Sequence, residues 1–174
     1  MSDLRIETAT AEGIRTETAA WVELLADAVA SGGGLGFLPP VPRAEGEAYF
    51  ARVADEVEAG TRIVLVARLH GALVGSAQLD LCMRPNGMHR AEAQKVMVHR
   101  RARRRGIGRA LMAAVDREAL ARGRTTLYLD TFAHQEARRM YEACGWTHAG
   151  DIPAFSVTAE GTLGTTSLYY KLLA

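Results

Sequence analysis

The sequence predicts one α+β domain over residues 1–174, with a mixed sheet of six to seven strands and about four flanking helices. The first observation behind this prediction is the order of the periodic segments. They run as strand, helices, antiparallel strands, and then strand–helix–strand–helix–strand. The second is an arginine- and glycine-rich turn that joins an apolar strand directly to a helix. The expected strands are residues 4–8, 62–69, 72–81, 91–99, 125–131 and 166–172, and the expected helices are residues 11–30, 43–59, 106–122 and 134–143.

The first half of the chain supplies a strand, two helices and a hairpin. Residues 4–8 alternate weakly between apolar and polar side chains, and residues 11–30 repeat apolar side chains at helical spacing. The density of Gly and Pro in residues 31–40 excludes a helix there, so this segment is a loop. Helical spacing resumes at residue 43 and ends at the C-cap glycine Gly60. The β-rich runs on either side of His70 and Gly71 indicate a hairpin.

The second half supplies the strand–helix–strand–helix–strand order. The strong strand 91–99 is followed by the helix 106–122, which Gly123 terminates. The buried face of that helix is expected to carry Leu111, Val115 and Leu120. A further strand leads into a short helix that ends at Gly145, and the clearest strand of the tail is 166–172.

The turn before residue 106 has the composition of an anion site. The N-terminus of a helix presents unpaired amides and a partial positive charge, which together attract phosphate. Gly106 and Gly108 lack the Cβ atoms that would keep an anion away from those amides. Arg103, Arg104 and Arg105 add cationic donors around the same point. The local prediction is a pyrophosphate cradle, and the alternative is a solvated arginine turn capped by glycines.

Three known phosphate loops compete for this turn. The dinucleotide-binding fingerprint needs a third glycine where this chain has Leu111, and the P-loop needs a Gly-Lys-Ser/Thr tripeptide that does not occur. The pattern Arg-x-x-Gly-x-Gly at Arg103, Gly106 and Gly108 resembles the acyl-CoA pyrophosphate loop of the GNAT family of N-acetyltransferases.

A second motif and the order of the elements extend this resemblance over nearly the whole chain. The family's short helix has the pattern Asn-x-x-Ala-x-x-apolar-Tyr followed by Gly-aromatic. It is matched here by His134, Ala137, Met140, Tyr141, Gly145 and Trp146, with His134 in place of the asparagine. The resemblance implies the GNAT fold, in which the sheet is splayed between its fourth and fifth strands.

The middle of the chain is similar to one branch of this family, the tabtoxin-resistance acetyltransferases. The similar segments are residues 76–82, 85–87 and 90–98, together with the glycine-rich stretch that ends at Gly36 and Phe37. Members of this branch acetylate the amino group of a β-lactam amino-acid toxin, which implies a role in antibiotic or toxin resistance.

The resemblance implies an acetyl-CoA-dependent N-acetyltransferase that acts on the primary amine of a small molecule by direct attack in a ternary complex. A protein N-terminal or lysine acetyltransferase is the alternative within the enzyme class, because this fold serves many acceptors. The alternative of another class is a non-catalytic module that binds acyl-CoA or nucleic acid. The net charge of +1 argues against a nucleic-acid partner.

Three side chains are candidates for proton transfer. A base near the acceptor raises the reactive, neutral fraction of an amine. Glu92 lies at the start of the strand that the resemblance places beside the thioester, and Asp130 lies at the end of the adjacent strand. The alternative is that Glu92 pairs with Arg90 or Lys95 and that Asp130 caps the next helix. Tyr141 is the family's usual proton donor to the sulfur of coenzyme A, and its alternative role is a core residue with a solvated hydroxyl.

The resemblance also assigns the binding residues. The backbone of Val96, Met97 and Val98 would pair with the pantetheine arm, and His134 would replace the asparagine that contacts it. The amides of Arg104, Arg105, Gly106, Ile107, Gly108 and Arg109 would bind the pyrophosphate, with the side chains of Arg103 and Arg109 as further contacts. Gly36 and Phe37 lie in the expected lid over the acceptor, and His89 or Arg90 would supply a cation for its carboxylate.

Further expectations concern the environment of the protein. No apolar run approaches the roughly 18 residues that cross a bilayer, and the N-terminus lacks the features of a signal peptide, so a cytoplasmic location without membrane contact is expected. Cys82, Cys144 and the scattered histidines lack the spacing of metal ligands, so no metal is expected. A homodimer is a further expectation, because domains of this family often pair.

Overall fold

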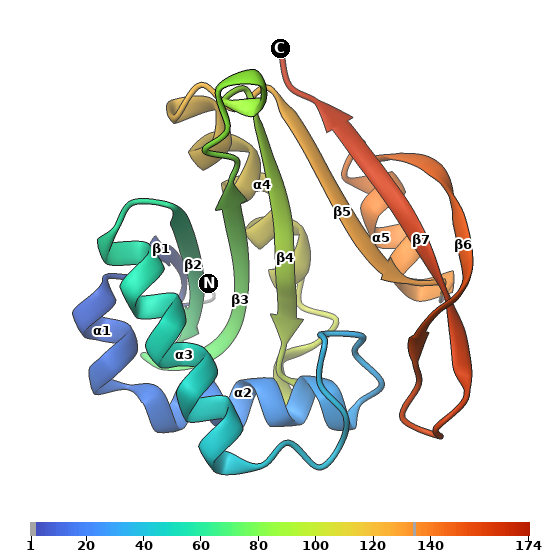
Figure 1. Ribbon diagram of the computed structural model, residues 1–174. Coiled ribbons are helices and arrows are strands. Elements are labelled where there is room, and N and C mark those ends of the chain that lie inside the picture. The colour runs from blue at the N-terminus through green and yellow to red at the C-terminus, as the bar shows by residue number, and fades with distance from the viewer. Residues whose placement is uncertain (1–2, 134) are drawn as a thin grey trace.

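The computed structural model describes residues 3–133 and 135–174, in which a seven-stranded mixed sheet has the order β1-β2-β3-β4-β5-β7-β6 (Figure 1). The strands are β1 (Leu4–Thr8), β2 (Arg62–Leu69), β3 (Ala72–Leu81), β4 (Arg90–Val98), β5 (Thr126–Phe132), β6 (Thr147–Val157) and β7 (Leu163–Leu172). The helices are α1 (Ala11–Thr16), α2 (Thr18–Ala30), α3 (Arg43–Glu58), α4 (Ile107–Ala121) and α5 (Gln135–Ala143), with short 3-10 turns at Pro85–Gly87 and Arg100–Ala102. The predicted α+β class and mixed sheet are confirmed, whereas His134 lies outside the described residues.

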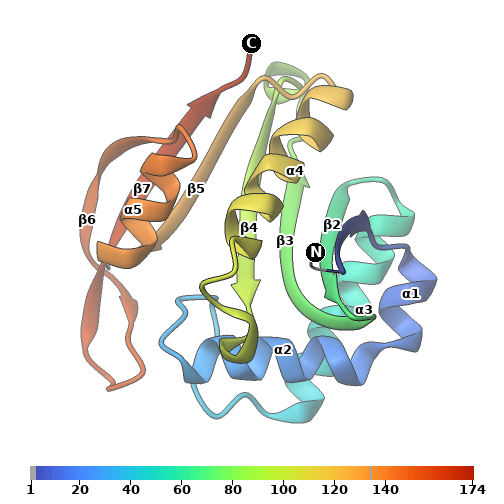
Figure 2. The same cartoon turned by 180° about the vertical axis from the view of Figure 1, so that it is seen from behind.

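Helices cover both faces of the sheet. In Figure 1 α1, α2 and α3 lie in front of the strands, and in Figure 2 α4 and α5 lie on the opposite face. Alternation along β2 divides its side chains between two cores. Val64 and Val66 join the core under α1–α3, whereas Ile63 and Leu65 join the core under α4 and α5. The continuous apolar run of this strand therefore supplies side chains to both layers.

The hairpin between β2 and β3 was predicted to the residue. His70 has a φ of 51° and Gly71 a φ of 80°, so both residues of the turn are left-handed, as a two-residue turn of type I′ requires. The strands pair in antiparallel register from Arg62 with Asp80 to Leu69 with Ala72.

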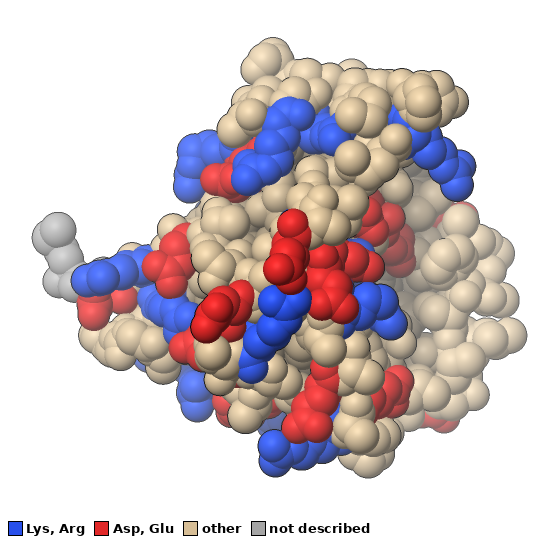
Figure 3. All heavy atoms as spheres, turned by 60° about the vertical axis from the view of Figure 1, so that its left-hand side comes forward, with Lys and Arg blue, Asp and Glu red and all other residues tan. Residues whose placement is uncertain are grey.

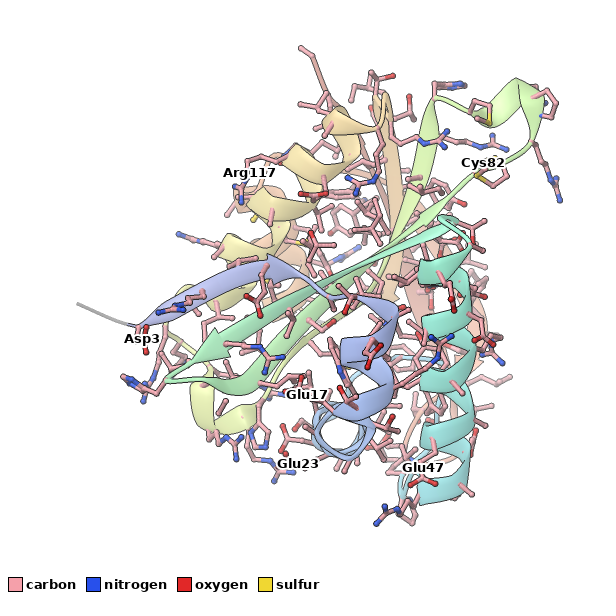
Figure 4. All side chains as sticks on the ribbon, turned by 90° about the vertical axis from the view of Figure 1, so that its left-hand side faces the viewer. Asp3, Glu17, Glu23, Glu47, Cys82 and Arg117 are labelled. Carbon is pink, nitrogen blue, oxygen red and sulfur yellow. The ribbon has the colours of Figure 1, made fainter. Side chains whose placement is uncertain are left out.

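The expected single helix over residues 11–30 is wrong, because the chain breaks at Glu17. This residue has φ −105° and ψ 21°, ends α1 and precedes α2. Flanking hydroxyls favour the break, since Thr16 and Thr18 bond to backbone carbonyls three and four residues earlier. The Glu17 carboxylate at this junction accepts a hydrogen bond from Arg68 of β2, which holds the bend against the sheet (Figure 4).

The expectation that Leu120 faces inward is also wrong. Leu111, Val115 and Ala119 are spaced by four residues along α4 and are fully buried. Leu120 lies one residue past this stripe, and its side chain is 42% exposed. The last buried residue of this face of α4 is therefore Ala119 and not Leu120.

The sheet opens between β4 and β5, as the resemblance implied. These parallel strands pair at Arg90–Thr126, Ala91–Leu127 and Glu92–Tyr128, after which β4 has no register with β5. β5 continues to pair with β7 as far as Phe132, so the two halves of the sheet diverge as a V (Figure 1). β4 also carries a bulge, where Lys95 and Val96 oppose the single residue Ala77 of β3.

Candidate active site

The turn after β4 forms a backbone concavity at the N-terminus of α4. Arg104 has a φ of 62° and Gly106, the N-cap, a φ of 76°. Alternating left-handed residues turn successive amides toward one point, which is the geometry of an anion-binding nest. Gly106 caps α4 without a side-chain hydrogen bond, so the amides of the first turn are available to a ligand. The predicted loop therefore has the geometry of a phosphate site.

Two contacts fix the position of this loop against its neighbours. The Nε of Arg103 donates to the carbonyl of Val98 at 3.0 Å, so part of this guanidinium is used within the protein. A Cβ at Gly108 would lie 3.0 Å from the Sδ of Met140, so this glycine allows α5 to approach α4 closely. Gly106 is needed for its φ and Gly108 for close packing.

The loop is also tied to α2 through its first arginines. The carboxylate of Asp27 accepts hydrogen bonds from the amide of Arg100 at 2.8 Å and from its guanidinium. Burial alone would raise the pKa of Asp27, but these bonds hold that pKa below its ordinary value. Beside it, the Nε2 of His99 lies 3.1 Å from the Oε1 of Glu23 (Figure 4). α2 also leads into the glycine-rich loop 31–40. The same helix therefore supports both that loop and the arginine-rich turn after β4.

The open edge of β4 presents backbone. Val98 and Met97 pair with Gly75 and Ser76 of β3, and neither has a partner in β5. The side chain of Met97 is buried in the core under α1–α3, and those of Val96 and Val98 pack against the opposite core. This segment can therefore offer an extended ligand the backbone groups that do not pair with β3, and the carbonyl of Val98 among them already accepts from Arg103.

Glu92 lies where β4 and β5 separate. Burial raises the pKa of this carboxyl group, the negative charges of Asp130 and Asp80 add to the rise, and hydrogen bonds from Gln94 and Tyr128 oppose it. Within residues 3–133 and 135–174, Glu92 forms no ion pair with Arg90 or Lys95. A carboxylate with a raised pKa is a stronger proton acceptor than an ordinary glutamate.

Asp130 lies farther along β5, opposite Leu168 of β7. It is an exposed strand residue, so it does not cap α5, which begins five positions later. Its charge raises the pKa of both Glu92 and Tyr141, which places all three ionisable groups in one electrostatic environment. Glu92 and Asp130 thus lie on the two strands that separate, and the charge of Asp130 acts on both Glu92 and Tyr141.

Tyr141 lies on α5 and faces the sheet. Its ring packs against Trp146 at 6.2 Å and Tyr169 at 5.8 Å between centroids, and the residue is 7% exposed. Its hydroxyl makes no hydrogen bond to any residue that the structure describes. Burial, and then the charge of Asp130, raises the pKa of this phenol, so it stays protonated and can donate. The ring is a core residue and the hydroxyl remains free for a ligand.

A pocket of about 350 Å³ lies at the open end of the V. Its wall comes from the loop 32–39, from β4 and β5, and from the tip of the β6–β7 hairpin. Its side chains include Phe37, Lys95, Asp130, Phe132 and Phe155, and Gly36 lies in its wall. The volume is that of a small-molecule site.

Not every predicted residue lines this pocket. Glu92 is outside its wall, toward the closed end of the V. His89 and Arg90 are also outside, at the start of β4, where Arg90 pairs with Thr126 and lies next to Cys82. The cation in the pocket is Lys95, which the sequence reasoning missed.

The other candidate partners find little support in the described residues. In the face shown in Figure 3, acidic and basic side chains are interspersed. Residues 3–133 and 135–174 contain no group of three or more His, Cys, Asp or Glu side chains that could hold a metal ion. No helix in the same part of the chain has the length and apolar character that spanning a membrane requires.

Known proteins match this chain in sequence. The model of the acetyltransferase (GNAT) family matches residues 25–146. An uncharacterized N-acetyltransferase from the hisH-hisA intergenic region of Azospirillum brasilense is 38% identical over 120 residues, which are 68% of each chain.

Solved structures match almost the whole chain. An N-acetyltransferase from Staphylococcus aureus Mu50 has a TM-score of 0.82 at 21% identity and covers 99% of this chain and 100% of its own. The yncA protein of Salmonella typhimurium, solved with its cofactor acetyl-CoA, has a TM-score of 0.81 at 20% identity, over 99% and 95% of the two chains. The ribosomal-protein-alanine N-acetyltransferase from Brucella melitensis has a TM-score of 0.77 at 25% identity, over 97% and 99%.

Proposed function

Because this chain belongs to the acetyltransferase (GNAT) family, we propose that it transfers the acetyl group of acetyl-CoA to the primary amine of a small molecule. One observation carries the proposal: the sheet opens beside an amide cradle. Beyond Glu92 the edge of β4 has no partner in β5, and the same strand leads directly into the nest at Gly106. An extended pantetheine arm fits the first feature and a pyrophosphate fits the second. The structure of the yncA protein, which was solved with acetyl-CoA bound as its cofactor, supports this choice of donor.

The proposed roles of the binding residues follow from what each group presents. The amides of residues 104–109 would hold the pyrophosphate, with the side chains of Arg103 and Arg109 as further contacts. The Nη atoms of Arg103 would make its contact, because its Nε donates to Val98. An amide of the segment 96–98 would donate to the acetyl carbonyl and polarise it. His134, the other predicted contact with pantetheine, lies outside the described residues, and its bond to pantetheine remains a prediction from the sequence.

Acetyl-CoA supplies a thioester carbonyl carbon. Asp130 and Glu92 would take a proton from the acceptor ammonium, directly or through water, so that the neutral nitrogen attacks that carbon. The new C–N bond forms as the C–S bond breaks. Tyr141 would give its proton to the departing sulfur, and its raised pKa keeps that proton in place until then. The attacking nitrogen then loses a second proton, which restores the phenol of Tyr141 directly or through water. The proton taken by the carboxylates returns to solvent, so the products are the amide, the free thiol of coenzyme A and one proton.

The size of the pocket favours a small acceptor. Its volume of about 350 Å³ lies at the lower end of the range for ligand sites. A β-lactam amino acid, the acceptor implied by the tabtoxin-resistance resemblance, belongs to this size class. The loop over the pocket has left-handed glycines at Gly32 and Gly36, and neither carries a side chain that would take up space in the pocket.

Protein N-terminal acetylation is the second candidate. The observation that favours it is the match to the ribosomal-protein-alanine N-acetyltransferase of Brucella melitensis over nearly the full length of both chains. This candidate requires the first residue of a peptide to occupy the pocket while the rest of the peptide extends out of it, past the β6–β7 hairpin or the loop 32–39.

An acceptor screen tests both candidates. Release of free thiol from acetyl-CoA would be measured with amino acids, β-lactam amino acids, polyamines, aminoglycosides and peptides that begin with alanine. Amine-dependent thiol release with a small molecule is the expected result, with the acetylated product confirmed by mass spectrometry. Transfer to peptides alone would favour the second candidate. Intact acetyl-CoA with every amine would refute both enzymatic candidates and leave a non-catalytic acyl-CoA-binding module.

A further inference from the structure

The acceptor pocket contains a cation at an unusual position in the sheet. Lys95 lies at the β4 bulge with a φ of 50°, a left-handed conformation that a glycine would adopt without strain. Lysine at such a position keeps a side chain where the backbone disfavours one. That side chain lines the pocket, and its Nζ lies 3.8 Å from the point where a Cβ of Gly36 would stand.

The ammonium group of Lys95 has no anionic partner in the described part of the chain. No carboxylate oxygen of residues 3–133 and 135–174 lies within 4.0 Å of its Nζ, and no hydrogen bond from it is found there. The Nζ lies over the ring of Tyr49, 5.7 Å from its centroid. Arg62, the cation next to it on the sheet, is by contrast fully engaged with Glu56, Asp80 and two glutamines.

The surroundings keep this charge poorly solvated. Burial, and then the positive charge of Arg62, lowers the pKa of Lys95, and the charge of Arg52 acts in the same direction. Asp130 and Glu92 oppose the fall, but both lie beyond ion-pair distance. A partly buried ammonium without a counter-ion is costly, and an anion bound in the pocket would remove that cost.

We propose that Lys95 binds the carboxylate of the acceptor and thereby selects a small zwitterion, an amino acid, over a simple amine. This inference rests on the proposed function. Asp130 and Lys95 are the two charged side chains of the pocket wall, of opposite sign, and they do not pair with each other. An amino acid places its ammonium group toward Asp130 and its carboxylate toward Lys95, whereas a simple amine meets the lysine as a like charge. Phe37, Phe132 and Phe155 give the same wall an apolar surface for its side chain.

A binding experiment tests the proposal independently of catalysis. The chain has two lysines, Lys95 and Lys171, so a protein labelled with ¹³C-lysine gives two sets of ε-methylene signals. Lys171 is bonded to Asp116 and to the carbonyl of Cys144, each at 2.6 Å, and serves as the internal reference. Lys95→Met assigns the signals. The standard amino acids and their decarboxylated amines would be titrated in the presence of coenzyme A.

The expected result is a saturable shift of the Lys95 signal with at least one amino acid and not with its decarboxylated amine, while Lys171 does not respond. Absence of a Lys95 response to every amino acid, or an equal response to the amine, overturns the proposal. If Lys95 responds but no acetyl transfer is found, the proposed function fails and the binding role stands.

Kinetics with the acceptor found in the screen give a second test. Lys95→Met is expected to lower kcat/KM about 10- to 100-fold for the amino acid, the effect of losing one charge-assisted hydrogen bond, and less than about threefold for the decarboxylated amine. Arg52→Met is the matched control, because Arg52 also lies over the Tyr49 ring, at 5.5 Å, but outside the pocket wall. It is expected to change both values less than about threefold, as for an exposed charge. An equal loss for both acceptors in Lys95→Met, or a rise in the KM for acetyl-CoA alone, overturns the selection.

Discussion

Replacement of Tyr141 by phenylalanine separates the two roles of this side chain. The ring contacts Trp146 and Tyr169, and phenylalanine preserves those contacts. The hydroxyl has no hydrogen-bond partner in residues 3–133 and 135–174, so its removal breaks no bond within that part of the chain. Tyr141→Phe should therefore leave stability within about 1 kcal/mol of the parent protein, a change of about 2–4 °C in Tm for a domain of this size.

The expected loss of activity follows from the leaving group. General acids contribute about 10²–10⁴-fold, and the lower end applies here because a thiolate, with a pKa near 8.5 for its acid, departs without full protonation. We expect kcat to fall about 10²-fold, which corresponds to about 2.7 kcal/mol. The KM for acetyl-CoA should stay within about threefold, because the lost interaction is made chiefly in the transition state.

Thiol release at saturating acetyl-CoA, combined with thermal unfolding, measures both quantities. Tyr169→Phe is the matched control, since Tyr169 is 1% exposed, packs on the same ring and donates only a long hydrogen bond of 3.5 Å to Glu142. It should retain kcat. Retention of more than about a third of kcat in Tyr141→Phe, or an equal loss in both variants, would refute the role of Tyr141 as proton donor.

Three further predictions concern the loop and the carboxylates. Gly106→Val places a β-branched residue at a φ of 76°, so we expect the KM for acetyl-CoA to rise at least about tenfold with a smaller change in kcat; an unchanged KM would contradict the amide cradle. Glu92→Gln removes a carboxyl group whose pKa is raised in the folded state. Its unfavourable ionisation makes the parent protein relatively less stable above the unfolded pKa, so the Tm of the variant relative to the parent should increase from about pH 4 to about pH 7. Asp27→Asn removes a carboxylate whose folded pKa is lowered. The sign is opposite: its Tm should be lower than that of the parent near pH 7, and the difference should shrink as the pH falls below about 4; a pH-independent difference would count against the Arg100 bond as its cause.

Local sequence patterns were sufficient for most of the fold. The β-rich runs, the His70–Gly71 turn and the glycines that follow α3, α4 and α5 depend on neighbouring residues, and the hairpin and the strand β5 were placed within a residue or two. The break at Glu17 was not predicted, because the local bonds of Thr16 and Thr18 only favour it and the bond that holds it comes from Arg68, 51 residues away. The exposure of Leu120 depends on the direction from which the sheet approaches α4, which helical spacing alone leaves undetermined.

The residues of the candidate site that belong to a local sequence motif were predictable. The residue that joins the site only through the shape of the pocket was not. Gly106 has a left-handed backbone, which a glycine in a turn readily adopts, and Tyr141 could be identified from the residue pattern of its helix. The cation for the carboxylate of the acceptor was expected at His89 or Arg90. Those residues lie at the start of β4, where β4 is still paired with β5 and the V is closed. Lys95 lies at the bulge farther along β4, at the open end of the V.

The bulge at Lys95 connects the two halves of the proposed reaction. An extra residue in β4 increases its local twist, and β4 has already left β5 three residues earlier, so the strand edge from Val96 onward is free for the donor. The same extra residue directs the ammonium of Lys95 into the acceptor pocket, beside the loop that follows α2. A regular strand would pair Ala77 with one residue and shift every later side chain to the opposite face. Met97 would then leave its core and Lys95 the pocket, so the donor edge, the core and the acceptor cation depend on one irregularity.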